Sequence, residues 1–441
     1  MACHTAKEGK NFAALLSFAN IFYFAFALLT HKNFSIISLH HLHSATRKMA
    51  LLVLLVSVLI LIIGWLRKVF NAKFIVLATL LPLNSFLLMT GLRIDVLVVH
   101  WIIQIMLVAT LITLSSNRKK SATAAIQVFM KTAFVLIFEL IGATLYIYST
   151  GSASLIDPMI IDSQLFTLSM ILIALPWLTW ALIFPFNSWF IDLTETIEFE
   201  ALAFILMAVC FPSFIKIIDL YIGLSPHVPA ANFSVITIGI WVICTVSAIY
   251  NFLLASKVQR TGSFIGFLVS GIFSICAFAL TINPIFYIEN RVFHYVLATV
   301  LPGISLFILF SPYFDQVGTV RQISGKKLGQ ILPKYYLFSV IFYFLLIFGL
   351  PLGRLFWDRI YILERLFYSA GTLPIVFSLS VMIFAVYPLF RLVNYTSEEN
   401  TQLPNGISWV TTSLTGELFR VIFLLVVLTL SIFPAIITTY L

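Results

Sequence analysis

The stretch WALIFPFNSWFIDLTETIEFEALAFI, residues 180–205, interrupts membrane-length apolar sequence with a proline, a polar turn and four acidic side chains. Pro185 lacks a backbone donor and clashes with the preceding helical turn, so a helix through this stretch is expected to break. Backbone groups freed by a break cannot face lipid, because the bilayer core holds no water to bond them. We therefore expect a discontinuous membrane helix whose elbow lies inside protein and marks the functional centre.

The composition of the whole chain is that of a membrane protein. Of 441 residues, 61% are hydrophobic and 10% are charged, unlike an ordinary globular domain. Roughly 20 apolar residues span the hydrocarbon as a helix. On this measure we predict an all-α, polytopic membrane protein with about thirteen transmembrane helices. Their predicted ranges are 11–30, 49–66, 73–91, 95–115, 123–149, 164–186, 200–221, 233–256, 262–285, 291–311, 335–357, 366–390 and 418–440.

The order of these helices predicts a single transmembrane domain over residues 1–441. Residues 1–122 form peripheral N-terminal helices, 123–390 form a core with two broken helices, and 391–441 form a polar link and a last helix. The second break is expected at Pro351. Two broken helices indicate an internal repeat, which is common in transporters.

The net charge of +9 comes from short basic clusters between apolar runs, which favours orientation in a bilayer over binding to nucleic acid. Clusters follow the even-numbered predicted helices, whereas the loops at 150–163 and 222–232 hold no lysine or arginine. The positive-inside rule therefore predicts a multi-pass protein of the cell inner membrane with a cytoplasmic N-terminus. The clusters are Arg67/Lys68/Lys73, Arg118/Lys119/Lys120, Lys257/Arg260 and Arg321/Lys326/Lys327/Lys334.

The cysteines and histidines predict no disulfide, metal site or cofactor. Three of four cysteines lie inside apolar runs, without the spacing of a metal motif. The histidines of the loop 31–48 lack carboxylates or cysteines at ligand spacing and are typical of a solvated loop.

Two ionisable residues, Lys131 and Glu139, lie in the predicted span 123–149. A charge there costs a few kcal/mol or more unless it is paired or wet. Eight positions separate them, about two helical turns and too far for the contacts that spacings of three or four allow. We expect Lys131 to extend to the membrane edge. Glu139 lies deeper, and it is either functional or a neutral, hydrogen-bonded carboxyl.

The acidic residues of the elbow also have two interpretations. On the cytoplasmic side an acidic surface can pair with basic groups of a partner protein. Alternatively, the carboxylates stabilise the positive end of the dipole of a helix that begins near Ala201. These residues are Asp192, Glu195, Glu198 and Glu200.

The elbow resembles a family motif. Pro185-Phe-Asn-Ser-Trp-Phe-Ile-Asp192 is similar to the Pro-Phe-His-x-Trp-Leu-x-Asp signature of the antiporter-like membrane subunits. These subunits occur in respiratory complex I, in Mrp-type cation/proton antiporters and in bacterial inorganic-carbon uptake systems. Trp189 keeps the tryptophan of the signature, and Asn187 replaces its histidine.

Four partial motifs follow in the order of this family. Lys257-Val-Gln-Arg260 resembles a helix start, Phe293-His294 resembles the family's Phe-His helix, and 318–333 resembles the loop after it. Gly349-Leu-Pro-Leu-Gly-Arg-Leu-Phe-Trp-Asp-Arg359 resembles the second broken helix. The resemblance implies an antiporter-like fold and a proton-relay role for His294. Arg359 takes the place of a lysine, and it can fix a carboxylate such as Asp358 or Glu364.

Several charged positions of the family are not charged here. The glutamate that follows a tryptophan in an early helix corresponds to Ile102, and protonatable positions further on correspond to Trp180, Ile205 and Gln259. A rival register gives the glutamate's role to Glu139. It places that residue far closer to Pro185 than the family does, so we favour the Ile102 register.

The resemblance implies a proton- or sodium-translocating subunit that works with a cytoplasmic or membrane partner in a larger complex, as in respiratory translocases or inorganic-carbon uptake. The ion-pathway candidates are Glu139, His294, Lys131, Arg359 and Asp358. The alternative is a non-conducting scaffold that keeps the fold and has lost the proton-carrying residues.

Overall fold

The computed structural model describes residues 44–67, 69–91, 93–115, 119–155, 158–224, 227–228, 230–258, 260–277, 289–314, 340–346, 354–370, 373–397 and 414–432. Within these ranges the regular structure is helical, apart from one isolated bridge between Arg93 and Ser154. The all-α fold class is therefore confirmed. Seven of the described helices are long and apolar enough to cross a membrane, so the predicted count of thirteen is not confirmed.

Contacts divide the chain into two units, which we describe separately. The first unit comprises Met1–Trp180 and Glu200–Phe233, and the second comprises Ala181–Phe199 and Ser234–Leu441. The elbow, residues 181–199, thus belongs to the second unit, whereas the helices that precede and follow this range belong to the first. The predicted division at residues 122 and 390 stays a prediction.

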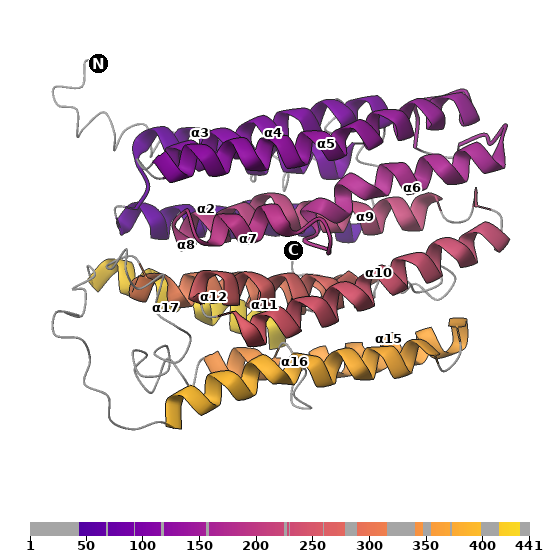
Figure 1. Ribbon diagram of the computed structural model, residues 1–441. Helices are drawn as coiled ribbons and strands as arrows, with labels where there is room; N and C mark the ends of the chain where they lie inside the picture. Colours follow the sequence, from indigo (N-terminus) through magenta and orange to yellow (C-terminus); the bar gives the residue numbers. More distant parts are fainter. Residues whose placement is uncertain are drawn as a thin grey trace, which may run out of the picture. The chain divides into compact units, whose positions relative to one another are not determined.

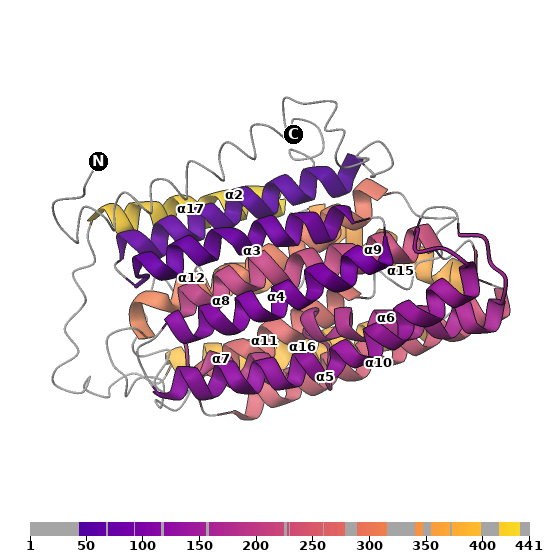
Figure 2. The ribbon, with the colours of Figure 1, turned by 90° about the horizontal axis from the view of Figure 1, so that it is seen from above.

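The first unit is a bundle in which consecutive helices pack against each other (Figures 1 and 2). The apolar helix α5 packs along both α4 and α6, and α3 packs on α2 and α4. Its centre contains large aromatic side chains: the ring of Trp101 lies 5.0 Å from that of Trp177 and 5.8 Å from that of Trp180. Its helices are α2 (Ser44–Leu66), α3 (Ala72–Thr90), α4 (Ile94–Ser115), α5 (Lys119–Thr150), α6 (Ser163–Trp180), α8 (Phe199–Ile205) and α9 (Phe211–Leu224).

A π-helical segment, η2 (Leu206–Cys210), joins α8 to α9, so that the three form one helix with a bulge. A π-bulge leaves a backbone carbonyl out of the regular ladder, and such bulges are frequent at functional sites. Here the Ser85 hydroxyl of α3 donates to Ala208 O, inside the bulge. Phe211, the residue after the bulge, is fully buried.

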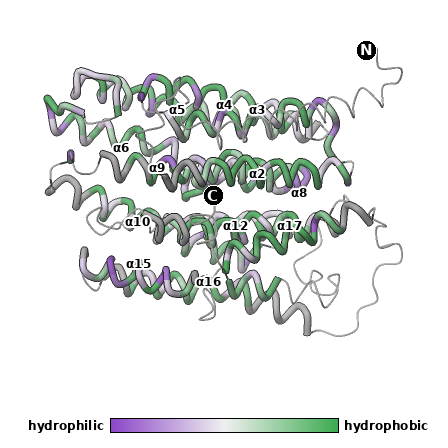
Figure 3. Tube along the Cα trace, turned by 180° about the vertical axis from the view of Figure 1, so that it is seen from behind, coloured by the Kyte–Doolittle hydropathy of each residue, from purple (hydrophilic) through white to green (hydrophobic). Residues whose placement is uncertain are grey.

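In the second unit α11 packs on α12 and on the short elbow helix α7, while α12 packs on α15 and α17. The helices are α7 (Ser188–Thr194), α10 (Ala230–Lys257), α11 (Thr261–Cys276), α12 (Glu289–Phe314), α15 (Arg354–Ala370), α16 (Leu373–Ser397) and α17 (Leu414–Ile432). Hydrophobic residues cover most of these helices, and α15 carries several hydrophilic residues (Figure 3).

One predicted boundary is wrong. Residues 358–365 were expected to link two spans, but they lie in the middle of α15. Five charged residues occur between Arg354 and Arg365, and they lower the average hydropathy of this stretch below that of a span. The helix is amphipathic rather than apolar, so a rule based on apolar length divides it.

Candidate functional site

The predicted elbow is present. Helix α6 ends at Trp180 and α7 begins at Ser188, so the chain leaves the helix five residues before Pro185. Leu182 adopts a left-handed backbone conformation with φ of 58°, which few residues other than glycine adopt. Pro185 in turn disfavours the helical conformation at Phe184. These two positions explain why the helix stops.

A buried chain of neutral side chains holds the elbow of the second unit. Phe184 N–H donates to Ser247 Oγ at 2.8 Å, and Asn187 Nδ2 donates to Asn251 Oδ1 at 2.8 Å. Asn251 Nδ2 donates to Ser247 Oγ at 3.3 Å. Ser274 gives its proton to Ser270 O, so Ser247 must donate the 2.7 Å bond between the two serine hydroxyls. Helices α10 and α11 thus supply the partners that the broken backbone needs.

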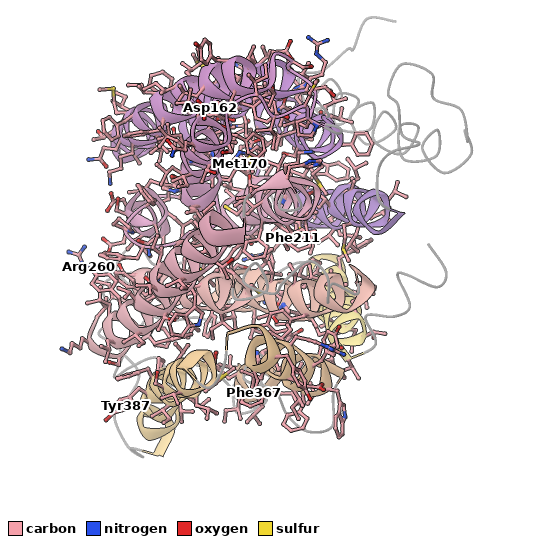
Figure 4. The ribbon with its side chains drawn as sticks, turned by 90° about the vertical axis from the view of Figure 1, so that its right-hand side faces the viewer. Asp162, Met170, Phe211, Arg260, Phe367 and Tyr387 are labelled. Atoms are coloured by element: carbon pink, nitrogen blue, oxygen red, sulfur yellow. The ribbon has the colours of Figure 1, made fainter. Side chains whose placement is uncertain are left out.

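The short helix α7 is fixed closely against α11. A Cβ atom on Gly262 would lie 2.5 Å from Thr194 O, and one on Gly266 would lie 2.8 Å from the Thr194 methyl group. Only glycine permits this approach. Next to it, Glu195 forms an ion pair with Arg260 and accepts a hydrogen bond from Ser263. The side chain of Arg260 lies at the edge of the second unit in Figure 4.

The acidic residues of the elbow do not form one surface. Glu195 is engaged with Arg260 and Ser263, and Glu200 is fully buried and paired with Arg67, the residue after α2. Glu200 is therefore unable to bind a partner protein, which corrects its predicted docking role. It lies in the first turn of α8, as the helix-capping interpretation expected. Asp192 is exposed and Glu198 is half-buried.

The helix α8–η2–α9 is enclosed by protein over its apolar window Phe199–Ile218. It carries Glu200 with its partner Arg67 at one end, and Lys216 four turns further along. Lys216 is 1% exposed, and its ammonium donates to Met89 O at 3.2 Å and to Gly91 O at 2.8 Å. These carbonyls lie at the C-terminal end of α3, where the helix dipole favours a cation.

Sequence reasoning missed Lys216 and the pair of Arg67 with Glu200. The family's protonatable position that the sequence analysis placed in this helix is Ile205, which is buried and apolar. A lysine inside an apolar run is itself a signal of function, because the membrane interior disfavours it. Searching the span for any ionisable residue, rather than for aligned positions, finds Lys216.

Glu139 lies on the buried face of α5. Its side chain is 0% exposed, and neither carboxylate oxygen has a hydrogen-bond partner among the residues that the structure describes. Gly142 and Tyr146 follow on the same face, where Gly142 meets Ile173 of α6 and the Tyr146 ring packs on Phe166 of α6. Lys131 is half-exposed on α5 and forms no ion pair with Glu139.

The remaining candidates are in the second unit. Asp358 and Arg359 are both buried on α15, and no ion pair joins Arg359 to Asp358 or Glu364 in the described part of the chain. The carboxylate-fixing role of Arg359 therefore stays a prediction. His294 belongs to α12, but its side chain lies outside what the structure describes. Pro351 also lies outside the described residues.

No protein-family model and no curated protein matches this chain. Solved structures do match over 97% of its length. One is a chain of respiratory complex I from Thermus thermophilus with bound aureothin, with a TM-score of 0.77, 16% identity and 94% of that chain covered. The chain has the predicted antiporter-like membrane fold. A chain of the same complex with bound NADH gives a TM-score of 0.73 at 15% identity, with 91% of that chain covered.

A second respiratory assembly shares this fold. A chain of the membrane-bound sulfane sulfur reductase, an archaeal respiratory membrane complex, matches with a TM-score of 0.69 at 15% identity, and 91% of that chain is covered. Identities of 15–16% support a shared antiporter-like fold. The chemistry depends on the residues of this chain. The protein is a multi-pass membrane protein.

Proposed function

We propose that this chain is a proton- or sodium-translocating subunit that works within a larger membrane complex. The observation that carries the proposal is Glu139, a carboxyl group inside a membrane helix with no hydrogen-bond partner among the described residues. An ionised carboxylate there costs several kcal/mol unless a cation or water reaches it. Intramembrane ionisable groups kept at such a cost mark ion pathways.

Other groups of the first unit support this proposal. Lys216 and the pair of Arg67 with Glu200 place further charge inside one enclosed helix, at separate depths. The π-bulge between them gives that helix a backbone irregularity of the kind found at functional sites. We infer that translocation uses Glu139 and Lys216, with Lys131, His294, Asp358 and Arg359 as further candidates.

A larger assembly is proposed for two reasons. The solved structures that share the fold are chains of respiratory membrane complexes. In addition, the apolar residues Ile102, Trp180 and Ile205 interrupt the family's row of protonatable groups. A partner subunit can complete the path, and Asp192 and Glu198 remain surface groups that it can contact. If the complex energises inorganic-carbon uptake, the partner subunit is cytoplasmic. The genes that flank this one distinguish a role in inorganic-carbon uptake from a role in a respiratory complex.

We propose an inner-membrane orientation in which the end of the first unit with Arg67, Lys73 and Lys119 is cytoplasmic. Asn71 Nδ2 donates to Leu114 O at 3.2 Å, which places the basic link before α3 beside the C-terminal end of α4.

The orientation predicts that a single cysteine at position 73 reacts with a membrane-impermeant reagent only in inside-out vesicles. One at position 162, which is exposed before α6, reacts only in intact cells. The reverse pattern contradicts the orientation.

Replacing Glu139 by glutamine is expected to reduce ion-dependent activity at least tenfold, because glutamine fills the same volume but cannot bind and release a proton. The measurement is ion-driven activity of the assembled complex in membrane vesicles, normalised to the amount of folded chain. Glu364→Gln is the matched control, since Glu364 is exposed on α15 and should leave activity unchanged. Full activity of Glu139→Gln at normal abundance would remove the main support for translocation.

One observation favours a second candidate, the non-conducting scaffold. The elbow, where the resembling family has a histidine, is held here by Asn187, Ser247, Asn251 and Ser274, none of which titrates near neutral pH. On this hypothesis the broken helix only shapes a docking surface. Glu139→Gln then leaves ion-dependent activity intact, whereas loss of the whole chain disassembles the complex.

A further inference from the structure

Arg359 is a buried guanidinium in the second unit. It projects from α15, and its side chain is 6% exposed. The groups within its electrostatic reach are the Tyr295 hydroxyl of α12 and the Cys276 thiol of α11. Met382 of α16 also lies beside it. Four helices therefore enclose one positive charge.

The hydrogen-bond donors of Arg359 are largely unused. A guanidinium has five N–H donors in a rigid plane. Nη1 reaches the Met382 sulfur at 3.9 Å, and sulfur is a weak acceptor. Nε and Nη2 have no partner among the residues that the structure describes. The Tyr295 hydroxyl donates to Ile275 O at 3.1 Å, so toward Arg359 it can only accept a hydrogen bond. This contact still leaves the Nε and Nη2 atoms without a partner among the described residues.

No negative charge balances this guanidinium within the described residues. Arg359 takes part in none of the ion pairs there. Removing a charge from water without a partner is costly, and structures that keep such a charge normally pair it. Lys216 shows the contrast within the same chain, since its ammonium is equally buried but donates to two carbonyls. Arg359 is thus a buried cation with two donor atoms that have no partner among the described residues.

The unused atoms define the chemistry of the missing group. Nε and Nη2 share one edge of the guanidinium plane and present two parallel N–H donors. This edge fits the two oxygens of a carboxylate, in the bidentate arrangement that gives arginine its preference for planar oxyanions. A carboxylate places one oxygen on each donor, whereas a spherical anion such as chloride shares a single atom between the two. The surrounding Tyr295, Cys276 and Met382 are neutral side chains and supply no competing charge.

We propose that Arg359 forms a binding site for a small planar oxyanion of the carboxylate or bicarbonate class, enclosed by α11, α12, α15 and α16. The site does not depend on ion translocation by Glu139, which belongs to the first unit. It adds an anion to a chain whose proposed cargo is a cation.

The test is thermal unfolding of the full-length chain in detergent, with sodium acetate or sodium bicarbonate compared with sodium chloride at equal ionic strength and pH. The wild-type chain is expected to show a saturable rise in Tm of a few degrees with acetate or bicarbonate, because a ligand that binds only the folded state stabilises it. Arg359→Lys keeps the charge but loses the two-donor edge, so most of the rise should disappear. Arg359→Met should abolish it.

The Tm values without added oxyanion give a second, independent readout. Arg359→Met removes a charge that has no partner in the described structure, so its Tm should equal or exceed that of the wild type. Lys216→Met is the matched control: it leaves two carbonyls without their donor, so its Tm should fall while the acetate-dependent rise persists. An oxyanion-specific rise that survives in Arg359→Met overturns the proposal. A fall in Tm for Arg359→Met as large as that for Lys216→Met, with no oxyanion effect in the wild type, also overturns it.

Discussion

Replacing Glu200 by glutamine is expected to destabilise the protein by about 3–5 kcal/mol, one of the two largest effects that the structure predicts. Glu200 and Arg67 form an ion pair in which both side chains are buried. Glutamine keeps the volume but removes the charge that compensates the guanidinium, and an uncompensated buried charge is costly. The measurement is the free energy of unfolding in detergent, supported by the yield of folded chain.

Two further variants make this result specific to the pair. Glu198→Gln is the matched control, because Glu198 lies two residues earlier and is only half-buried, so its loss should cost less than about 1 kcal/mol. The double variant Arg67→Met, Glu200→Leu should recover most of the loss, since apolar side chains of similar volume replace buried pairs well. If Glu200→Gln and Glu198→Gln cost the same, the pair contributes little to stability.

The second large effect is expected at Ser247. Its hydroxyl accepts from Phe184 N–H and Asn251 Nδ2 and donates to Ser274, so alanine leaves three buried polar groups short of a partner. Each such group costs about 1–3 kcal/mol, and we expect a total loss of about 2–4 kcal/mol because some can find new partners. Unfolding in denaturant measures this loss.

Ser431→Ala is the control for Ser247→Ala. Ser431 is equally buried on α17 of the same unit, but its hydroxyl only donates to Val427 O of its own helix. That carbonyl can still accept its helical hydrogen bond, so alanine should cost less than about 1 kcal/mol. If the two variants lower the free energy of unfolding equally, the hydrogen bonds of Ser247 do not stabilise the elbow.

The break of the helix could be predicted because its cause is local. Pro185 and the polar residues after it disrupt a helix whatever surrounds them, and the structure breaks between Trp180 and Ser188. What replaces the lost backbone bonds is not local. Ser247 and Ser274 are small residues in apolar runs, and only the packing of α10 and α11 reveals that they face the elbow.

The charges of the candidate site were harder to predict for the same reason. Glu195 and Glu200 look alike in the sequence, yet one pairs with Arg260 near the surface and the other with Arg67 in the interior. Their partners are distant in the sequence, so neither pairing follows from spacing. Lys216 does not lie at a position where the resembling family has a protonatable residue, and only the cost of a lysine in an apolar span marks it. Glu139 could be predicted because a carboxyl group deep inside an apolar span is unusual whatever its partners are.

The most direct test of ion translocation is a flux measurement on the purified assembly in proteoliposomes. An imposed proton or sodium gradient is followed with dyes enclosed in the vesicles, in parallel with vesicles that carry the assembly with Glu139→Gln and with protein-free vesicles. The account predicts that the wild-type assembly moves protons or sodium across the membrane and that the variant does so at least tenfold more slowly, because the pathway needs a group that binds and releases the ion. Wild-type vesicles that remain as tight to both ions as protein-free vesicles, under conditions in which the complex is intact and active, would contradict it.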